Sequence, residues 1–183
     1  MKTFLQSLRL LAALTVLTGL LYPLAVWACG RAFFPHAAEG SLLLRDGRPA
    51  GSALLAQKNA DARYFQPRPS AGDHATVASG AGNQAWTSAK LRAAIEERRR
   101  THSGSAEVPA DLLTASGSGL DPHLSPEAVR AQIARVAESR QLSAAQRVEL
   151  DSLITRLTEG GALSPARINV LQLNLALDAT FSR

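Results

Sequence analysis

The sequence contains a single cysteine, Cys29, and few aromatic residues, which make up 5% of its 183 residues. One cysteine excludes a disulfide within the chain, so packing must stabilise the folded part. A function in binding single-stranded nucleic acid is disfavoured, because such proteins stack bases on aromatic side chains along a basic groove. The net charge is only +5, from 20 basic and 15 acidic residues, and the only basic run is residues 98–100. We interpret this run as a solvated helix end, where the helix dipole favours arginine.

Motifs for nucleotide binding, hydrolysis and metal binding are also missing. The sequence has no Gly-x-x-x-x-Gly-Lys-Ser/Thr motif, and no lysine follows the Ser-Gly-Ser-Gly stretch at 116–119. Neither Ser116 nor Ser118 lies in a Gly-x-Ser-x-Gly motif, so neither is expected to be a nucleophile. Four histidines do not have the spacing of metal ligands: His36, His74, His102 and His123. We therefore expect no catalytic residue, no metal site and no bound cofactor.

One long apolar run lies near the N-terminus. Between Arg9 and Arg31 the sequence has no charged residue. About 20 apolar residues suffice to cross a hydrocarbon core roughly 30 Å thick. The run therefore predicts a transmembrane helix over residues 10–30, with Trp27 at the far interface and a kink at Pro23.

The flanking charges predict the orientation of this helix. The tail of residues 1–9 carries Lys2, Arg9 and the free amine without any acid, whereas Glu39 and Asp46 follow the apolar run. By the positive-inside rule, the tail is cytoplasmic. Residues 31–183 then form a single extracytoplasmic domain, which is periplasmic in a cell with two membranes.

Two alternatives to a retained anchor stay open. Residues 26–28 end in a small residue that a signal peptidase accepts, and Cys29 is a possible lipidation site. Both are disfavoured, because the apolar run is longer than the roughly 7–15 residues of a signal-peptide core. Trp27 is also a bulky neighbour for a lipidated cysteine.

The pattern after the apolar run predicts an α+β domain with a small hairpin or sheet and several amphipathic helices. Two short apolar runs, residues 41–45 and 51–56, flank Asp46-Gly47, which is a strong hairpin signal. Residues 72–82 are rich in Ala, Ser and Gly, and we expect a long loop there.

Apolar residues at helical spacing predict three helices, over residues 88–99, 126–140 and 143–157. Ser143 and Gln146 have the spacing of a capping box, and Gly160-Gly161 ends the third helix. The apolar residues on one helix face are Leu91, Ala94 and Ile95 in the first helix and Val129, Ile133, Val136 and Ala137 in the second. The third helix is expected to bury Val148, Leu153, Ile154 and Leu157. Residues 166–178 fit a helix, which we prefer, but their near alternation leaves a strand open.

Residues 108–126, VPADLLTASGSGLDPHLSP, place four small residues between an apolar run and a helix start. Glycine adopts backbone angles closed to other residues, and we expect this at both Gly117 and Gly119. Ser125-Pro126-Glu127 follows as an N-cap, a proline at the first helical position and an acid in the first turn. This block resembles the C subunit of the Kdp potassium-transporting P-type ATPase, the KdpC family.

Other blocks resemble the same family in the same order over nearly the whole chain. They are GSALLAQ at 51–57, YF at 64–65 with RPSA at 68–71, SG at 79–80 and INVLQLNLALD at 168–178. Two stretches depart from the family pattern. Residues 66–67, Gln-Pro, stand where relatives usually carry an aromatic residue and a glycine, and residues 83–87, NQAWT, replace a turn that contains Gly-Pro.

The resemblance implies a non-catalytic accessory subunit of a high-affinity, ATP-driven potassium uptake complex in the cell inner membrane. It implies two partners, a channel-like potassium-binding subunit and a catalytic P-type ATPase subunit, with K⁺ as the transported ion. The chain has no Asp-Lys-Thr-Gly-Thr block to accept phosphate, so another subunit would use ATP. An ATP-binding role, sometimes attached to the family, is disfavoured because nucleotide is scarce outside the cytoplasm.

The glycine-containing loop is our candidate for contact with a partner, through Ser116, Gly117, Ser118, Gly119 and Asp121. Glu107, Asp111 and Asp121 frame this loop, and acids near the outer mouth of a pore would raise the local cation concentration. The simpler interpretation is that Asp111 and Asp121 cap turns. A function of another class also stays open, that of a stand-alone membrane-anchored or lipidated periplasmic binding module.

Overall fold

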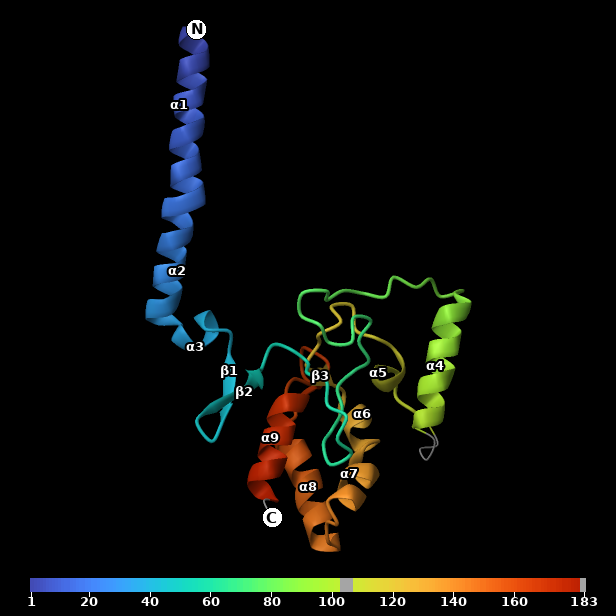
Figure 1. The fold of residues 1–183 in the computed structure, drawn as a ribbon. Helices are drawn as coiled ribbons and strands as arrows, with labels where there is room; N and C mark the ends of the chain where they lie inside the picture. Colours follow the sequence, from blue (N-terminus) through green and yellow to red (C-terminus); the bar gives the residue numbers. More distant parts are fainter. Residues whose placement is uncertain (103–106, 182–183) are drawn as a thin grey trace. The chain divides into compact units, whose positions relative to one another are not determined.

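The computed structural model describes residues 1–102 and 107–181 and divides the chain into two compact units, Met1–Leu42 and Leu43–Arg183 (Figure 1). The first unit is helical. The second combines two small sheets with helices, so the α+β prediction is confirmed.

The first unit contains one helix long and apolar enough to cross a membrane, Lys2–Phe33, with a mean hydropathy of 1.9. It comprises α1 (Lys2–Val16), a π-helical turn (Leu17–Leu21) and α2 (Tyr22–Phe33), and α3 (Pro35–Ala38) follows. The helix extends beyond the predicted residues 10–30 at both ends. The helix is irregular just before Pro23, where the Tyr22 N–H donates to the Leu17 carbonyl, five residues earlier. Proline has no N–H and cannot continue the regular α-helical hydrogen bonds.

The hairpin consists of β1 (Leu42–Arg45) and β2 (Arg48–Ser52). Asp46 and Gly47 connect the strands with φ of 51° and 74°. Positive φ at both central residues is the geometry of a two-residue type I′ turn, which explains the Asp-Gly pair. The hairpin prediction is confirmed, although the second strand begins before residue 51 because the turn is only two residues long.

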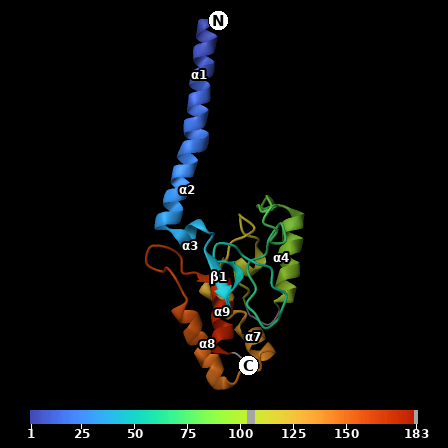
Figure 2. The same ribbon diagram turned by 60° about the vertical axis from the view of Figure 1, so that its left-hand side comes forward.

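The helices of the second unit begin at capping residues. Ser88 caps α4 (Ala89–Thr101), and Ser143 with Gln146 forms a complete capping box on α8 (Ala144–Arg156). Both helices were predicted from the sequence. The short α5 (Ala110–Leu113) lies against α4. Figures 1 and 2 show α7, α8 and α9 together at one end of this unit, with α4 apart from them.

The predicted helix over residues 126–140 is two helices, α6 (Pro126–Arg130) and α7 (Ile133–Ser139). The break falls at Ala131-Gln132, because the buried Gln132 side chain bonds a distant backbone segment. The last element contains both predicted alternatives. A two-residue strand, β4 (Ile168–Asn169), pairs antiparallel with β3 (His123–Leu124), and α9 (Val170–Thr180) follows, capped by Asn169.

The core of the second unit lies where α6 to α9 pack around Phe65, which is fully buried. In α8 the buried residues are Leu150, Leu153 and Ile154. The prediction for Val148 was wrong, since its side chain is 70% exposed. Residues 150, 153, 154 and 157 share one helix face, from which residue 148 points away.

Candidate functional site

The glycine-containing loop is tied to the body of the second unit at its ends and exposed in its middle. Ser116 is buried, its N–H donates to the Pro69 carbonyl (3.3 Å), and its hydroxyl accepts from the Asp121 N–H (3.5 Å). Gly117 and Ser118 are exposed to solvent. The middle of the loop therefore presents a small, mostly backbone surface.

The two glycines of this loop differ. Gly119 has φ of +73°, and a Cβ placed there would lie 2.9 Å from the carbonyl oxygen of Gly80. Gly117 does not have positive φ, and a Cβ there would meet nothing within 4 Å. The expectation that both positions need glycine was therefore wrong for Gly117, whereas Gly119 lies where two backbone segments pack closely.

The structure brings two of the three predicted acids together. Arg68 Nη1 lies 3.4 Å from Asp121 Oδ2 and 4.0 Å from Asp111 Oδ1. Each carboxylate also bonds backbone: Asp111 accepts from the Ser125 N–H (2.8 Å), and Asp121 accepts from the His123 N–H (3.0 Å). The Asp121 bond is that of a turn cap, whereas Asp111 bonds the backbone of a residue 14 positions later. That these acids raise the local concentration of cations stays a prediction.

The third acid, Glu107, is exposed and forms no ion pair with any residue that the structure describes. A pocket of about 450 Å³ opens beside the other two acids, lined by Arg68, Asp111, Asp121, His123, Ser125 and Arg167 among others. Across residues 1–102 and 107–181, no three His, Cys, Asp or Glu side chains are grouped to hold a metal ion. Within the same ranges, neither Ser116 nor Ser118 has a histidine nitrogen as a hydrogen-bond partner.

Sequence analysis missed a second arrangement, in which two buried carboxamides hold an extended backbone segment. Asn174 accepts from the Phe65 N–H (2.9 Å) and donates to the Phe65 carbonyl (2.9 Å). Gln132 does the same for the next residue, accepting from the Gln66 N–H (2.9 Å) and donating to its carbonyl (3.1 Å). The two side chains replace the neighbouring strands that this segment lacks. We call residues 61–69 the clamped segment.

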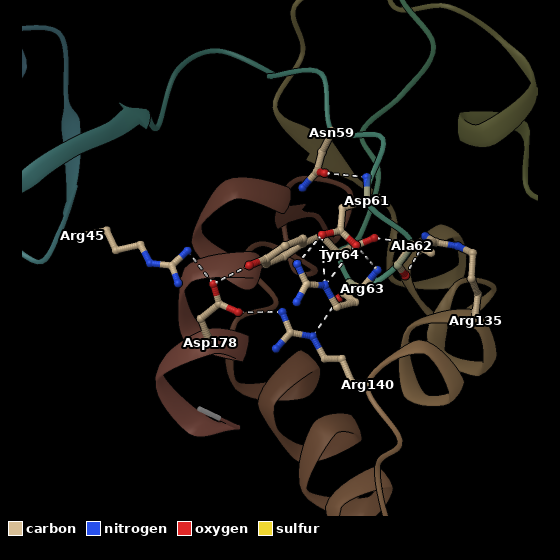
Figure 3. A network of polar contacts seen from close by, with 9 residues as sticks. All are labelled: Arg45, Asn59, Asp61, Ala62, Arg63, Tyr64, Arg135, Arg140 and Asp178. Atoms are coloured by element: carbon tan, nitrogen blue, oxygen red, sulfur yellow. Dashed lines mark hydrogen bonds and ion pairs between the residues drawn. The ribbon is translucent and has the colours of Figure 1, made fainter. Parts of the chain in front are cut away.

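Asp178 is the centre of an adjoining polar network (Figure 3). One carboxylate oxygen accepts from Arg140 (2.6 Å), and the other accepts from the Tyr64 hydroxyl (2.9 Å) and pairs with Arg45 (2.7 Å). The guanidinium of Arg140 also lies 4.8 Å from the centre of the Tyr64 ring, within cation–π range. The network thereby joins the first hairpin, the clamped segment and α7 to the last helix.

Arginine side chains complete the hold on the clamped segment. Arg135 donates to the carbonyls of Ala62 (2.7 Å) and Tyr64 (3.1 Å), and half-burial lowers its pKa. Arg140 donates to the Arg63 carbonyl (2.7 Å). Within the segment, hydrogen bonds from Arg63 lower the pKa of Asp61 to about 2. The Tyr64 hydrogen bond and the charge of Asp178 raise the pKa of Arg45.

These interactions tie together segments that are distant in the sequence. The carboxylate of Asp178 is satisfied by three donors, and no activated nucleophile lies beside it among the described residues. The sequence block 168–178 gave a local signal. However, Asn174 bonds Phe65 and Asp178 bonds Tyr64, and each of these partners lies more than 100 residues earlier in the chain.

Comparison with known proteins points to one family. The model of the KdpC family, described as "K+-transporting ATPase, c chain", matches residues 4–179. A protein named potassium-transporting ATPase KdpC subunit from Leptospira interrogans serogroup Icterohaemorrhagiae serovar copenhageni is 46% identical over 179 residues, which cover 96% of this chain and 93% of the relative.

Two further proteins with the same name show the same degree of similarity. The one from Methylococcus capsulatus is 47% identical over 187 residues, covering 96% of this chain and 97% of the relative. The one from Sorangium cellulosum is 47% identical over 183 residues, covering 94% and 95%. The similarity therefore extends over both units, from the apolar helix to α9.

Proposed function

The chain belongs to the KdpC family, and on that premise we propose that it is a non-catalytic accessory subunit that assembles and stabilises an ATP-driven potassium uptake complex. Its partners are the channel-like potassium-binding subunit and the catalytic P-type ATPase subunit. K⁺ is the transported ion, and the ATP is used by the catalytic partner. The match over residues 4–179, together with one apolar helix, carries this proposal.

The proposed location is the cell inner membrane, with a single span and the second unit in the periplasm. The helix Lys2–Phe33 supports an anchor, and the basic tail supports a cytoplasmic N-terminus. Arg31 supports an interface at the other end, since its guanidinium pairs with Glu39 (2.8 Å) and lies 5.6 Å from the centre of the Trp27 ring. Tryptophan and arginine are favoured where a helix leaves the bilayer.

The proposed mode of action is contact between surfaces. The exposed middle of the glycine-containing loop, Gly117 and Ser118, is the candidate contact with the channel-like subunit. Its ends are fixed by the bonds of Ser116 and Asp121, so little conformational entropy is lost on binding. The anchor adds affinity by packing against partner helices.

Co-purification from cells that express all subunits tests this function. A tagged chain is expected to retain both large subunits in mild detergent, and removal of the chain is expected to abolish growth at low potassium. A chain that purifies as a monomer and whose loss leaves that growth unchanged would instead favour the stand-alone binding module. Digestion of residues 41–181 by protease added to intact spheroplasts tests the orientation.

A further inference from the structure

Two apolar side chains in the long loop before α4 have almost no contact with the rest of the unit. Val77 is 101% exposed and Trp86 is 85% exposed. A tryptophan side chain buries roughly 150–250 Å² when it packs, so leaving it in water forgoes a large hydrophobic gain. Tryptophan is also the residue type most enriched among those that dominate binding energies at protein interfaces. Trp86 therefore has the exposure expected of an anchor whose partner is another molecule.

The turn that carries Trp86 is held in place by its own hydrogen bonds. The Ser88 N–H donates to the Ala85 carbonyl (2.9 Å), and the Ser88 hydroxyl donates to the Gln84 side chain (2.9 Å). Gln84 in turn donates to the Gly82 carbonyl (3.0 Å). A side chain presented by a pre-organised turn costs less entropy to bind than one on a free loop.

Positive charge without a counter-charge lies beside this turn. Lys90 and Arg92 are in the first turn of α4 and form no ion pair within the described ranges, whereas Glu96 and Glu97 both pair with Arg100 farther along the helix. Residues 74–95 contain no Asp or Glu. The chemistry around Trp86 is therefore complementary to a surface that bears carboxylates.

The same loop packs against the proposed contact loop. Gly119 packs on the backbone of Gly80, so closely that a Cβ at residue 119 would lie 2.9 Å from the Gly80 carbonyl oxygen. Residues 71–87 and the exposed Gly117 and Ser118 thus lie on neighbouring segments, and we call them together the loop surface. In Figure 1 the green part of this surface runs from the body of the unit to α4.

We propose that Trp86 anchors the loop surface to another subunit of the pump, by entering an apolar recess bordered by carboxylates that face Lys90 and Arg92. This inference rests on the proposed function and adds to it the residue and the chemistry of the contact. A polypeptide fits this surface better than a lipid. Residues 78–85 are Ala, Gly, Ser, Asn and Gln in an irregular backbone, whose polar groups need hydrogen-bond partners that hydrocarbon lacks.

Hydroxyl-radical footprinting read by mass spectrometry measures the exposure of Trp86 without changing the chain, and it separates this tryptophan from those of the partners. Oxidation of Trp86 is expected to fall several-fold in the complete pump compared with the chain alone in detergent. Unchanged oxidation in an assembled pump would overturn the inference and leave the proposed function intact. Failure of the unmodified chain to assemble would overturn both.

Two other occupants give different footprints. Protection of the chain alone in nanodiscs that contain anionic phospholipid would identify a lipid surface and overturn the inference. Protection that rises with the concentration of the chain alone in detergent would identify a second copy, with the same consequence. Neither is expected.

Variants supply the second measurement. Trp86→Ala is expected to weaken co-purification with the large subunits at least about 30-fold, the scale of an interface hot spot, and Trp86→Phe should weaken it less. Lys90→Glu should weaken it most at low salt. Val148→Ala removes another exposed apolar side chain, on α8, and should change nothing. Unaltered co-purification of Trp86→Ala would contradict the proposal.

Discussion

Gln132 forms a pair of hydrogen bonds with Gln66, accepting from its N–H at 2.9 Å and donating to its carbonyl at 3.1 Å. A strand neighbour would form the same two bonds, but here one side chain on the break between α6 and α7 supplies both. The side chain is 2% exposed, so water cannot replace it.

Replacing Gln132 with leucine is therefore expected to destabilise the second unit by about 2–3 kcal/mol, because it strands a backbone N–H and a backbone C=O away from solvent. Thermal unfolding of the purified full chain in detergent measures this. The control is Gln57→Leu, an exposed glutamine whose side chain has no hydrogen bond within the described ranges. Equal melting temperatures for the two variants would contradict the role of Gln132.

The two arginines that pair with Asp178 form a matched test of burial. Arg140 and Arg45 lie at 2.6 and 2.7 Å from its oxygens, but their side chains are 11% and 53% exposed. Arg140→Ala should lower the free energy of unfolding by about 3 kcal/mol, since it removes a positive charge that balances the mostly buried carboxylate of Asp178. Arg45→Ala should cost less than about 1 kcal/mol because solvent screens this pair. Urea unfolding decides the order, and a reversed order would refute the argument.

The glycine-containing loop predicts a contrast between neighbouring positions. Gly119→Ala combines a positive φ with a Cβ only 2.9 Å from a carbonyl oxygen, and should cost about 1–3 kcal/mol and weaken assembly. Gly117→Ala, with open space around it, should stay within about 0.5 kcal/mol of the original chain. Melting temperature and co-purification are the measurements, and similar losses at both positions would contradict the contrast.

Asp61 predicts a pH dependence. Hydrogen bonds from Arg63 lower its pKa from 3.8 to about 2 in the folded chain. The unfolded chain then binds more protons than the folded chain in that window, so the contribution of Asp61 is complete above pH 3.8 and is lost as the pH falls through about 2. The melting temperature of Asp61→Asn should therefore lie below that of the original chain near pH 5 and converge with it near pH 2. Glu138→Gln, an exposed acid without an ion pair among the described residues, is the control, and a difference that persists at pH 2 would contradict this assignment.

Elements with local signals were predicted correctly. Ser88 and Ser143 mark helix starts through their own side chains, and the Asp46-Gly47 pair specifies its turn through backbone angles. Each of these signals acts within four residues. The glycine-containing loop was located for the same reason, since its capping residues lie next to it in the sequence, and its contact with a partner stays a prediction.

The features that sequence analysis missed depend on distant partners. Gln132 interrupts a helix because its side chain bonds Gln66, which lies 66 positions earlier in the chain. Asn174 bonds Phe65, which lies 109 positions earlier. Gly117 and Gly119 look alike in sequence, and only the approach of Gly80 separates them. Helical periodicity cannot predict such contacts, because it indicates which residues of a helix share a face but not which distant residues pack against that face.

Two residues of α9, Asn174 and Asp178, hold the clamped segment. A ribosome makes residues 61–69 more than 100 residues before it makes these partners. The second unit consequently cannot complete its core until α9 has been synthesised. During that interval Phe65 and its backbone are exposed and prone to aggregate, so the yield of this protein depends on how quickly α9 is synthesised.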